Sequence, residues 1–156
     1  MFESSKDWKV KKLEDWNIVA VEILKHFPEQ KIFALYGEMG VGKTTLVKSF
    51  CKALGVTEEA VSPTFSLVNE YKVQPHPKSL SQREGLEYSD KIYHFDLYRL
   101  KNAEELLDIG FEEYLADDAF CFIEWPELAE PFLPSSAVNL RLELSDEENS
   151  RTIKTD

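Results

Sequence analysis

The segment from Gly37 to Thr44 is the feature that most constrains how this chain can fold. Its sequence, GEMGVGKT, matches the pattern G-x-x-x-x-G-K-[ST], in which backbone N–H groups surround phosphate oxygens. The pattern needs a buried strand before it and a helix after it, because the helix N-terminus supplies further N–H donors. The apolar run Ile32 to Tyr36 and the helical stripe that begins at Leu46 meet both requirements. An α/β fold built around a phosphate-binding loop is therefore predicted.

Helical and extended patterns occur on both sides of this loop. Apolar residues from Trp16 to Phe27 recur at three- and four-residue steps and predict a helix that Pro28 ends. A second short helical segment is predicted to begin at Asn102, which has the spacing of an N-cap before Glu105. Strands are predicted over 65–73, 91–100, 119–123 and 138–144. We expect a P-loop NTPase-like three-layer α/β fold with a mixed, partly parallel sheet.

Two segments are less regular, and neither suggests a second domain. Residues 74–90 are polar and contain Pro75, Pro77 and Gly85, so we expect a long, mobile loop between two strands. Residues 146–156 are predicted to form a polar tail or a last edge strand. The whole chain, 1–156, is expected to be a single domain, because its 156 residues suffice for one hydrophobic core.

Composition restricts the partners and the compartment that we expect. The formal net charge of −11 argues against a broad basic surface for nucleic acid, so any RNA contact must be local or made by a partner. Cys51 and Cys121 have neither zinc nor disulfide-framework spacing. No apolar run resembles a signal peptide or approaches the ~20 residues that span a bilayer. We expect a cytoplasmic protein with no membrane segment.

The residue types of the phosphate-binding loop indicate which ligands it binds. Glycines let backbone N–H groups turn toward phosphates, Lys43 neutralises phosphate charge, and the Thr44 hydroxyl is offered to magnesium. ATP and Mg²⁺ are therefore the predicted cofactors. The candidate binding residues in the loop are Gly37, Glu38, Met39, Gly40, Val41, Gly42, Lys43, Thr44 and Thr45.

Hydrolysis requires polar groups beyond the loop, to complete the metal shell and to orient water. Glu124 ends the buried run FCFIE, and ligands of open α/β sheets collect at the carboxyl ends of strands. Glu124 is therefore a candidate metal ligand or water-polarising base. The alternative is an exposed glutamate just past a strand.

A polar trio lies on one face of the strand predicted over 91–100. Alternation places His94, Asp96 and Tyr98 together. Asp96 is a candidate metal ligand or acceptor for Thr44, with His94 setting its orientation. The alternative is the solvated face of an edge hairpin. Which of Asp96 and Glu124 binds metal and which orients water stays open at this stage.

Three further residues are candidates for contact with the nucleotide. Thr64, in Ser62-Pro63-Thr64-Phe65, lies where many nucleotide-binding proteins keep a segment that senses the γ-phosphate. Its alternative is a loop-to-strand junction. Trp125 is expected near the nucleotide and Trp16 near the base, although tryptophans in such positions are more often core or rim aromatics.

Five motifs together resemble a known family. In order, they are GEMGVGKTTL, SPTFSLVNEY, YHFDLYRL, NAEELLDIGFEEYL and FIEWPE. They closely resemble the TsaE (YjeE) family, the P-loop ATPase of bacterial tRNA threonylcarbamoyladenosine (t6A) synthesis. The resemblance implies an ATPase that works with TsaD and TsaB and whose hydrolysis resets their complex. It also implies that Lys43 is the P-loop lysine, that Thr44 is the magnesium-binding threonine and that Thr64 lies in the switch-like segment. By the same resemblance, Asp96 is the carboxylate of the HFD motif, and Glu124 and Trp125 belong to the IEW motif.

Other P-loop proteins are the competing hypotheses. A small-molecule kinase needs several arginines around the transferred phosphoryl group, and this chain has only Arg83, Arg99, Arg141 and Arg151. A guanine-nucleotide switch needs an N-K-x-D stretch, which the sequence lacks. A nucleotide-bound assembly factor without useful hydrolysis would not depend on the carboxylates for turnover.

Overall fold

The computed structural model describes residues 5–63, 66–74 and 90–156. These residues form one sheet of seven strands in the order β1-β7-β6-β2-β5-β4-β3. The strands are β1 (Asp7–Val10), β2 (Ile32–Tyr36), β3 (Val68–Lys72), β4 (Lys91–Asp96), β5 (Phe120–Glu124), β6 (Val138–Leu144) and β7 (Arg151–Thr155). The helices are α1 (Asp15–His26), α2 (Lys43–Leu54), α3 (Glu104–Asp108), α4 (Phe111–Ala116) and the 3₁₀ helix η2 (Pro126–Phe132).

The sheet is mixed, as the sequence predicted. Its centre is parallel, because β2 pairs in parallel with both β5 and β6, and β5 pairs in parallel with β4. The outer pairs β3–β4, β6–β7 and β1–β7 are antiparallel. The carboxyl ends of β2, β4 and β5 therefore meet at one edge of the sheet, which is where the loop after β2 begins.

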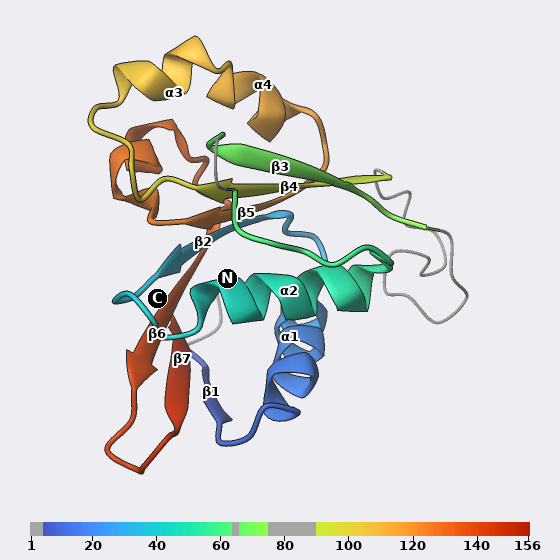
Figure 1. Ribbon diagram of the computed structural model, residues 1–156, viewed down its shortest axis with the longest axis vertical. Coiled ribbons are helices and arrows are strands. Elements are labelled where there is room, and N and C mark those ends of the chain that lie inside the picture. Colours follow the sequence, from blue (N-terminus) through green and yellow to red (C-terminus); the bar gives the residue numbers. More distant parts are fainter. Residues whose placement is uncertain (1–4, 64–65, 75–89) are drawn as a thin grey trace.

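Helices cover both faces of the sheet and give the predicted three layers (Figure 1). Helices α1 and α2 pack on one face, and α3, α4 and η2 pack on the other. On the α2 side, the rings of Phe50 and Phe122 stack with centroids 4.7 Å apart, and Phe33 packs beside them. Burial of this aromatic cluster fixes α2 against β2 and β5, and thus fixes the first residues of α2 beside the end of β5.

The helices begin and end close to the predicted positions. Helix α1 ends just before Pro28, and α2 is followed by Gly55, whose N–H bonds to the last turn. At α3, the side chain of Asn102 accepts a hydrogen bond from the N–H of Glu105 at 3.2 Å. The predicted cap at Asn102 is therefore confirmed.

The two ends of the chain pair with each other in a way that the sequence did not indicate. No strand was predicted before residue 16, yet β1 forms there with Trp8 and Val10 buried. Strand β1 pairs with β7, so β7 lies between β1 and β6 instead of at the sheet edge. Residues 75–89 of the long loop predicted over 74–90 lie outside the described residues.

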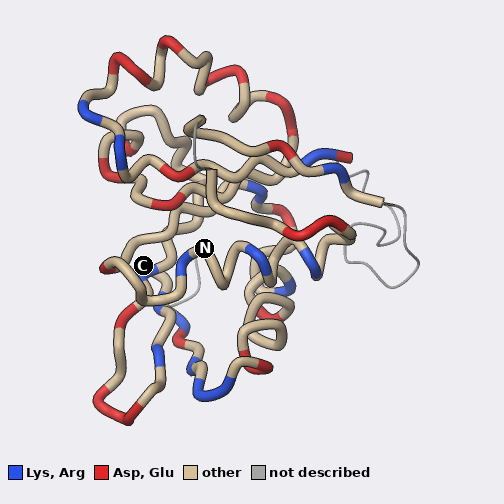
Figure 2. The backbone as a smooth tube through the Cα atoms, in the orientation of Figure 1, with Lys and Arg blue, Asp and Glu red and all other residues tan. Residues whose placement is uncertain are grey.

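Charges are distributed unevenly along the backbone (Figure 2). Asp and Glu recur along the segment of α3 and α4 and in the loop after β6, whereas Lys and Arg are dispersed over many elements. Within the described part of the chain, no helix has the length and apolar character needed to cross a membrane.

Candidate functional site

The phosphate-binding loop leaves the end of β2 and enters α2 at Lys43. Gly40 and Gly42 adopt φ angles of +81° and +119°, conformations that side-chain-bearing residues rarely adopt. Gly42 also lies directly over the indole of Trp16, because a Cβ built at Gly42 would be 2.4 Å from Cη2 of that ring. Trp16 is 7% exposed and belongs to the core. It therefore supports the loop from beneath.

Lys43 is held inside the loop. Its ammonium group donates hydrogen bonds to the carbonyl oxygens of Gly37 and Glu38. It also lies 3.8 Å from the centre of the Trp125 ring, in a cation–π contact. Burial lowers the pKa of Lys43, and the nearby carboxylate of Glu124 opposes that effect. Lys43 is thus a buried cation within the loop, where an anion would bind favourably.

Glu124 and Thr44 meet at the edge of the sheet. The Thr44 hydroxyl donates to both carboxylate oxygens of Glu124, at 2.8 and 3.0 Å. Oε2 of Glu124 also lies 2.6 Å from Nε2 of His94, and Ser62 Oγ lies 3.0 Å from the Thr44 hydroxyl oxygen. Glu124 is only 3% exposed and His94 is fully buried. The alternatives of an exposed glutamate and a solvated hairpin face are therefore wrong for Glu124 and His94.

Asp96 lies opposite Glu124 in the parallel register of β4 and β5. Its Oδ1 accepts a hydrogen bond from the N–H of Tyr98 at 3.1 Å. Burial raises the pKa of Asp96, and the hydrogen bond from Tyr98 opposes that shift. The sequence analysis paired His94 with Asp96, but the His94 ring contacts Glu124, because Glu124 is the diagonal neighbour of His94 across the two strands.

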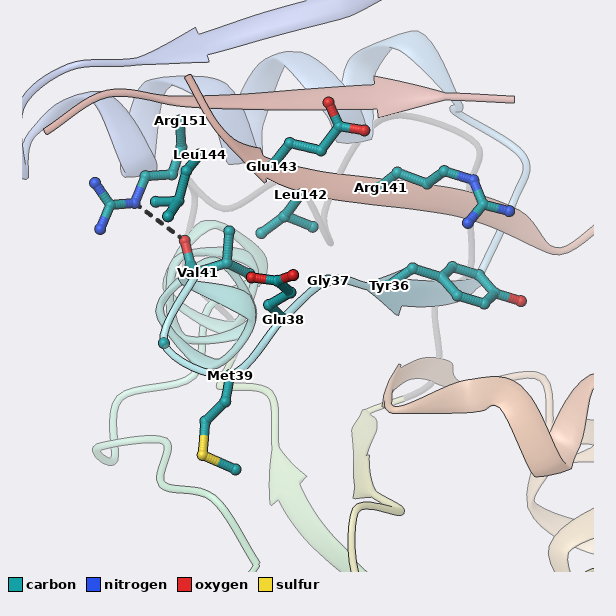
Figure 3. A pocket seen from close by; sticks show the side chains of 11 residues that line it. Tyr36, Gly37, Glu38, Met39, Val41, Arg141, Leu142, Glu143, Leu144 and Arg151 are labelled. Atoms are coloured by element: carbon teal, nitrogen blue, oxygen red, sulfur yellow. Dashed lines mark hydrogen bonds between the residues drawn. The ribbon is translucent and has the colours of Figure 1, made fainter. Parts of the chain in front are cut away.

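Two cavities flank the loop. A cavity of about 280 Å³ is lined by Met39, Gly40, Gly42, Lys43, Thr44, Thr45, Asp96, Tyr98, Glu124 and Trp125. A larger one of about 500 Å³ lies on the other side of the loop (Figure 3) and is lined by Tyr36, Gly37, Glu38, Met39, Gly40, Val41, Arg141, Leu142, Glu143, Leu144 and Arg151. Both cavities are lined in part by Met39 and Gly40 of the loop.

The structure brings some of the predicted site residues together and leaves Trp16 apart from them. Lys43, Thr44, Asp96, Glu124 and Trp125 come together around the smaller cavity. Trp16 lines neither cavity among the described residues; its burial beneath Gly42 corrects the expectation of a contact with a base.

Thr64 lies outside the described residues, so its predicted role stays a prediction. The sequence analysis missed Tyr36, Arg141 and Arg151, which line the larger cavity. Arg151 also donates from Nε to the carbonyl of Val41 at 3.3 Å (Figure 3). The position of Tyr36 directly before Gly37 was the one local signal that pointed to the site.

Comparisons with known proteins agree with this arrangement. The sequence model of the family described as threonylcarbamoyl adenosine biosynthesis protein TsaE matches residues 10–153. Curated proteins named tRNA threonylcarbamoyladenosine biosynthesis protein TsaE are similar. The one from Haemophilus influenzae is 34% identical, with 81% of this chain and 72% of that protein covered, and the one from Rickettsia bellii is 37% identical, with 75% and 72% covered.

A solved structure has the same fold. The crystal structure of YdiB from Bacillus subtilis superposes with a TM-score of 0.68 at 23% identity, covering 97% of this chain and 84% of that one. The α/β architecture predicted from the sequence is thus confirmed. Because the family match spans most of the residues and includes the loop, both carboxylates and the sheet that joins them, the chain belongs to the TsaE family.

Proposed function

We propose that this chain binds and hydrolyses ATP in the biosynthesis of tRNA threonylcarbamoyladenosine. The observation that carries the proposal is the hydrogen bond from Thr44 to Glu124, which joins the phosphate-binding loop to an acidic strand end. A loop that only binds phosphate does not need this connection, whereas an ATPase needs a hydroxyl and a carboxylate held together beside the phosphates. The pathway follows from the names of the similar TsaE proteins.

The residues of the smaller cavity suit a magnesium nucleotide. Magnesium is commonly held by one or two protein groups together with phosphates and water. Among the residues that the structure describes, no group of three or more His, Cys, Asp or Glu could hold a metal by itself. Thr44, Glu124 and Asp96 would hold the metal, directly or through water. When bound, magnesium would offset the negative charge of the β- and γ-phosphates.

Each side chain has a distinct part in the proposed reaction. Lys43 exchanges its hydrogen bonds to Gly37 and Glu38 for the phosphates. Glu124 accepts from Thr44 and keeps that hydroxyl oriented. Asp96 is less enclosed than Glu124 and lines the same cavity, so we assign it to holding the metal through water and to orienting the attacking water.

The adenosine is proposed to occupy the larger cavity. Its aromatic and basic lining includes Tyr36, whose ring lies 4.6 Å from the guanidinium of Arg141. Tyr36 also donates to Glu130 at 2.7 Å, and Arg141 pairs with Asp156. These contacts fix a flat, amphipathic wall of the kind that nucleobases and riboses contact.

Hydrolysis by the isolated chain is proposed to be slow. Among the described residues that line the smaller cavity, Lys43 is the cation and no arginine is present. Charge that develops on the transferred phosphoryl group is therefore stabilised by few donors. By family resemblance, TsaD and TsaB are the partners that would complete the site, and they would contact tRNA.

Steady-state ATPase assays and calorimetric ATP titrations test the proposal. The parent chain should bind ATP in the presence of Mg²⁺, with turnover that rises when TsaD and TsaB are added. Lys43→Ala should abolish binding, whereas Lys48→Ala, on the exposed side of the same helix, should leave it unchanged. Unaltered binding and hydrolysis by Lys43→Ala would contradict the proposal. No stimulation by the partners would favour the kinase or assembly-factor hypotheses.

A further inference from the structure

The buried pair of His94 and Glu124 lies behind the proposed metal site. His94 is fully buried in β4, and Glu124 is the last residue of β5. The register pairs His94 with Phe122, so Glu124 is two residues farther along on the same face. This diagonal placement brings His94 Nε2 to 2.6 Å from Glu124 Oε2. His94 contacts Glu124 but does not itself line the cavity.

The surroundings of the ring favour one tautomer. Nδ1 of His94 is buried and makes no hydrogen bond within the described part of the chain. A buried N–H without an acceptor is costly, whereas a bare ring nitrogen is tolerated more easily. The neutral ring therefore carries its hydrogen on Nε2 and donates it to Glu124.

That donation determines the hydrogen bonds of Thr44. The Thr44 hydroxyl has one hydrogen and two lone pairs, and it gives the hydrogen to the two oxygens of Glu124. Ser62 is then the donor in its 3.0 Å contact with Thr44. One lone pair of Thr44 is left for a cation. The chain from His94 through Glu124 to Thr44 thus presents an oxygen lone pair at the cavity.

We propose that His94 is a positioning residue for magnesium, acting through Glu124 on Thr44 without touching the metal or the nucleotide. The inference rests on the proposed function. Without His94, the carboxylate of Glu124 loses one of its hydrogen-bond donors. It is then drawn toward Lys43, the buried cation in the same cavity. Thr44 then loses its fixed acceptor. Outer partners of metal-site groups contribute about 10–100-fold to metal affinity or activity.

Calorimetric titration of a non-hydrolysable ATP analogue, over a series of Mg²⁺ concentrations, tests the proposal by binding. His94→Leu should raise the Mg²⁺ concentration needed for tight binding by about 10–100-fold and leave the metal-free affinity unchanged. His94→Gln, whose Nε2 amide also donates, should restore the parent's Mg²⁺ dependence. His26→Gln, in the partly exposed last turn of α1, is the matched control.

Three outcomes separate the two proposals. If the parent does not bind the analogue with Mg²⁺, the proposed function fails and this inference falls with it. If the parent binds but His94→Leu keeps the same Mg²⁺ dependence, the inference alone fails. It also fails if His94→Leu and His94→Gln are impaired equally, because a general packing defect would then explain both.

A second measurement needs no ligand. Nitrogen-15 NMR of the metal-free parent distinguishes the tautomers of its three histidines, and His94→Gln identifies the signals of His94 by their loss. We expect the hydrogen on Nε2. A hydrogen on Nδ1 of the neutral ring would overturn the inference, because Nε2 could not then donate to Glu124.

Discussion

Replacing Gly42 by alanine should destabilise the chain through two effects that the structure separates. The first is backbone strain, because Gly42 has a φ of +119°. The second is a clash, since the new Cβ would lie 2.4 Å from Cη2 and 2.6 Å from Cζ2 of Trp16. Gly40→Ala isolates the first effect, because Gly40 has a φ of +81° and a Cβ added there would have no heavy atom within 4 Å.

The expected magnitudes follow from these contacts. A residue forced into a rare backbone conformation costs about 1–3 kcal/mol, and an overpacked methyl group costs about 1–3 kcal/mol more. Gly42→Ala should therefore lower the free energy of unfolding by roughly 2–6 kcal/mol, and Gly40→Ala by the strain alone. For a domain of this size, each kcal/mol corresponds to about 2–4 °C in Tm.

Urea and thermal denaturation, followed by circular dichroism without nucleotide, measure both losses and avoid stabilisation by ligand. Trp16→Phe removes the ring atoms nearest to Gly42, so Gly42→Ala should cost less in that background than in the parent. Equal losses for Gly42→Ala and Gly40→Ala would refute the reasoning. So would an unchanged cost of Gly42→Ala after Trp16→Phe, because the clash with the indole would then be absent.

Two further predictions concern groups away from the loop. Burial raises the pKa of Cys51 and of Cys121 to about 12, so Ellman's reagent at pH 8 should react with neither thiol in the folded chain and with both in denaturant; rapid reaction without denaturant would contradict this. The N–H groups of Lys11 and Lys12 lower the pKa of Asp15, so its charge stabilises the fold above the ordinary pKa of 3.8 and this stabilisation is lost as the pH falls through the lowered value. Asp15→Asn should lower Tm at pH 7, and a Tm difference that does not shrink in acid would contradict the assignment.

The fold was predictable where the local pattern was long. Strand β2 is a continuous apolar run, helix α2 and strand β6 each carry a hydrophobic period over several residues, and all three formed as expected. Strand β1 has only Trp8 and Val10 as buried alternating residues, which is too short a pattern to recognise. The interior position of β7 depends on its pairing with β1 at the other end of the chain, and a local pattern carries no information on such partners.

For each site residue, the sequence predicted the strand face or the strand end on which it lies. Alternation placed His94 and Asp96 on one face, and the end of a buried run singled out Glu124. Which of these side chains touch depends on the neighbour of β4 and on the register of that pair. The contact of His94 with Glu124 is a consequence of that register. The sequence therefore identified both residues as candidates but could not predict that they contact each other.

The loop conformation depends on residues outside the phosphate-binding pattern. Trp16 from α1 supports Gly42 from below, and Arg151 from β7 donates to the carbonyl of Val41 at 3.3 Å. From β6, the carbonyl oxygen of Leu142 would lie 2.8 Å from a Cβ at Gly37. Because these contacts come from three elements outside the loop, substitutions in α1, β6 or β7 can shift the loop while its motif stays intact. A match to the pattern therefore establishes which groups face a phosphate, and the surrounding packing decides how well they are aligned.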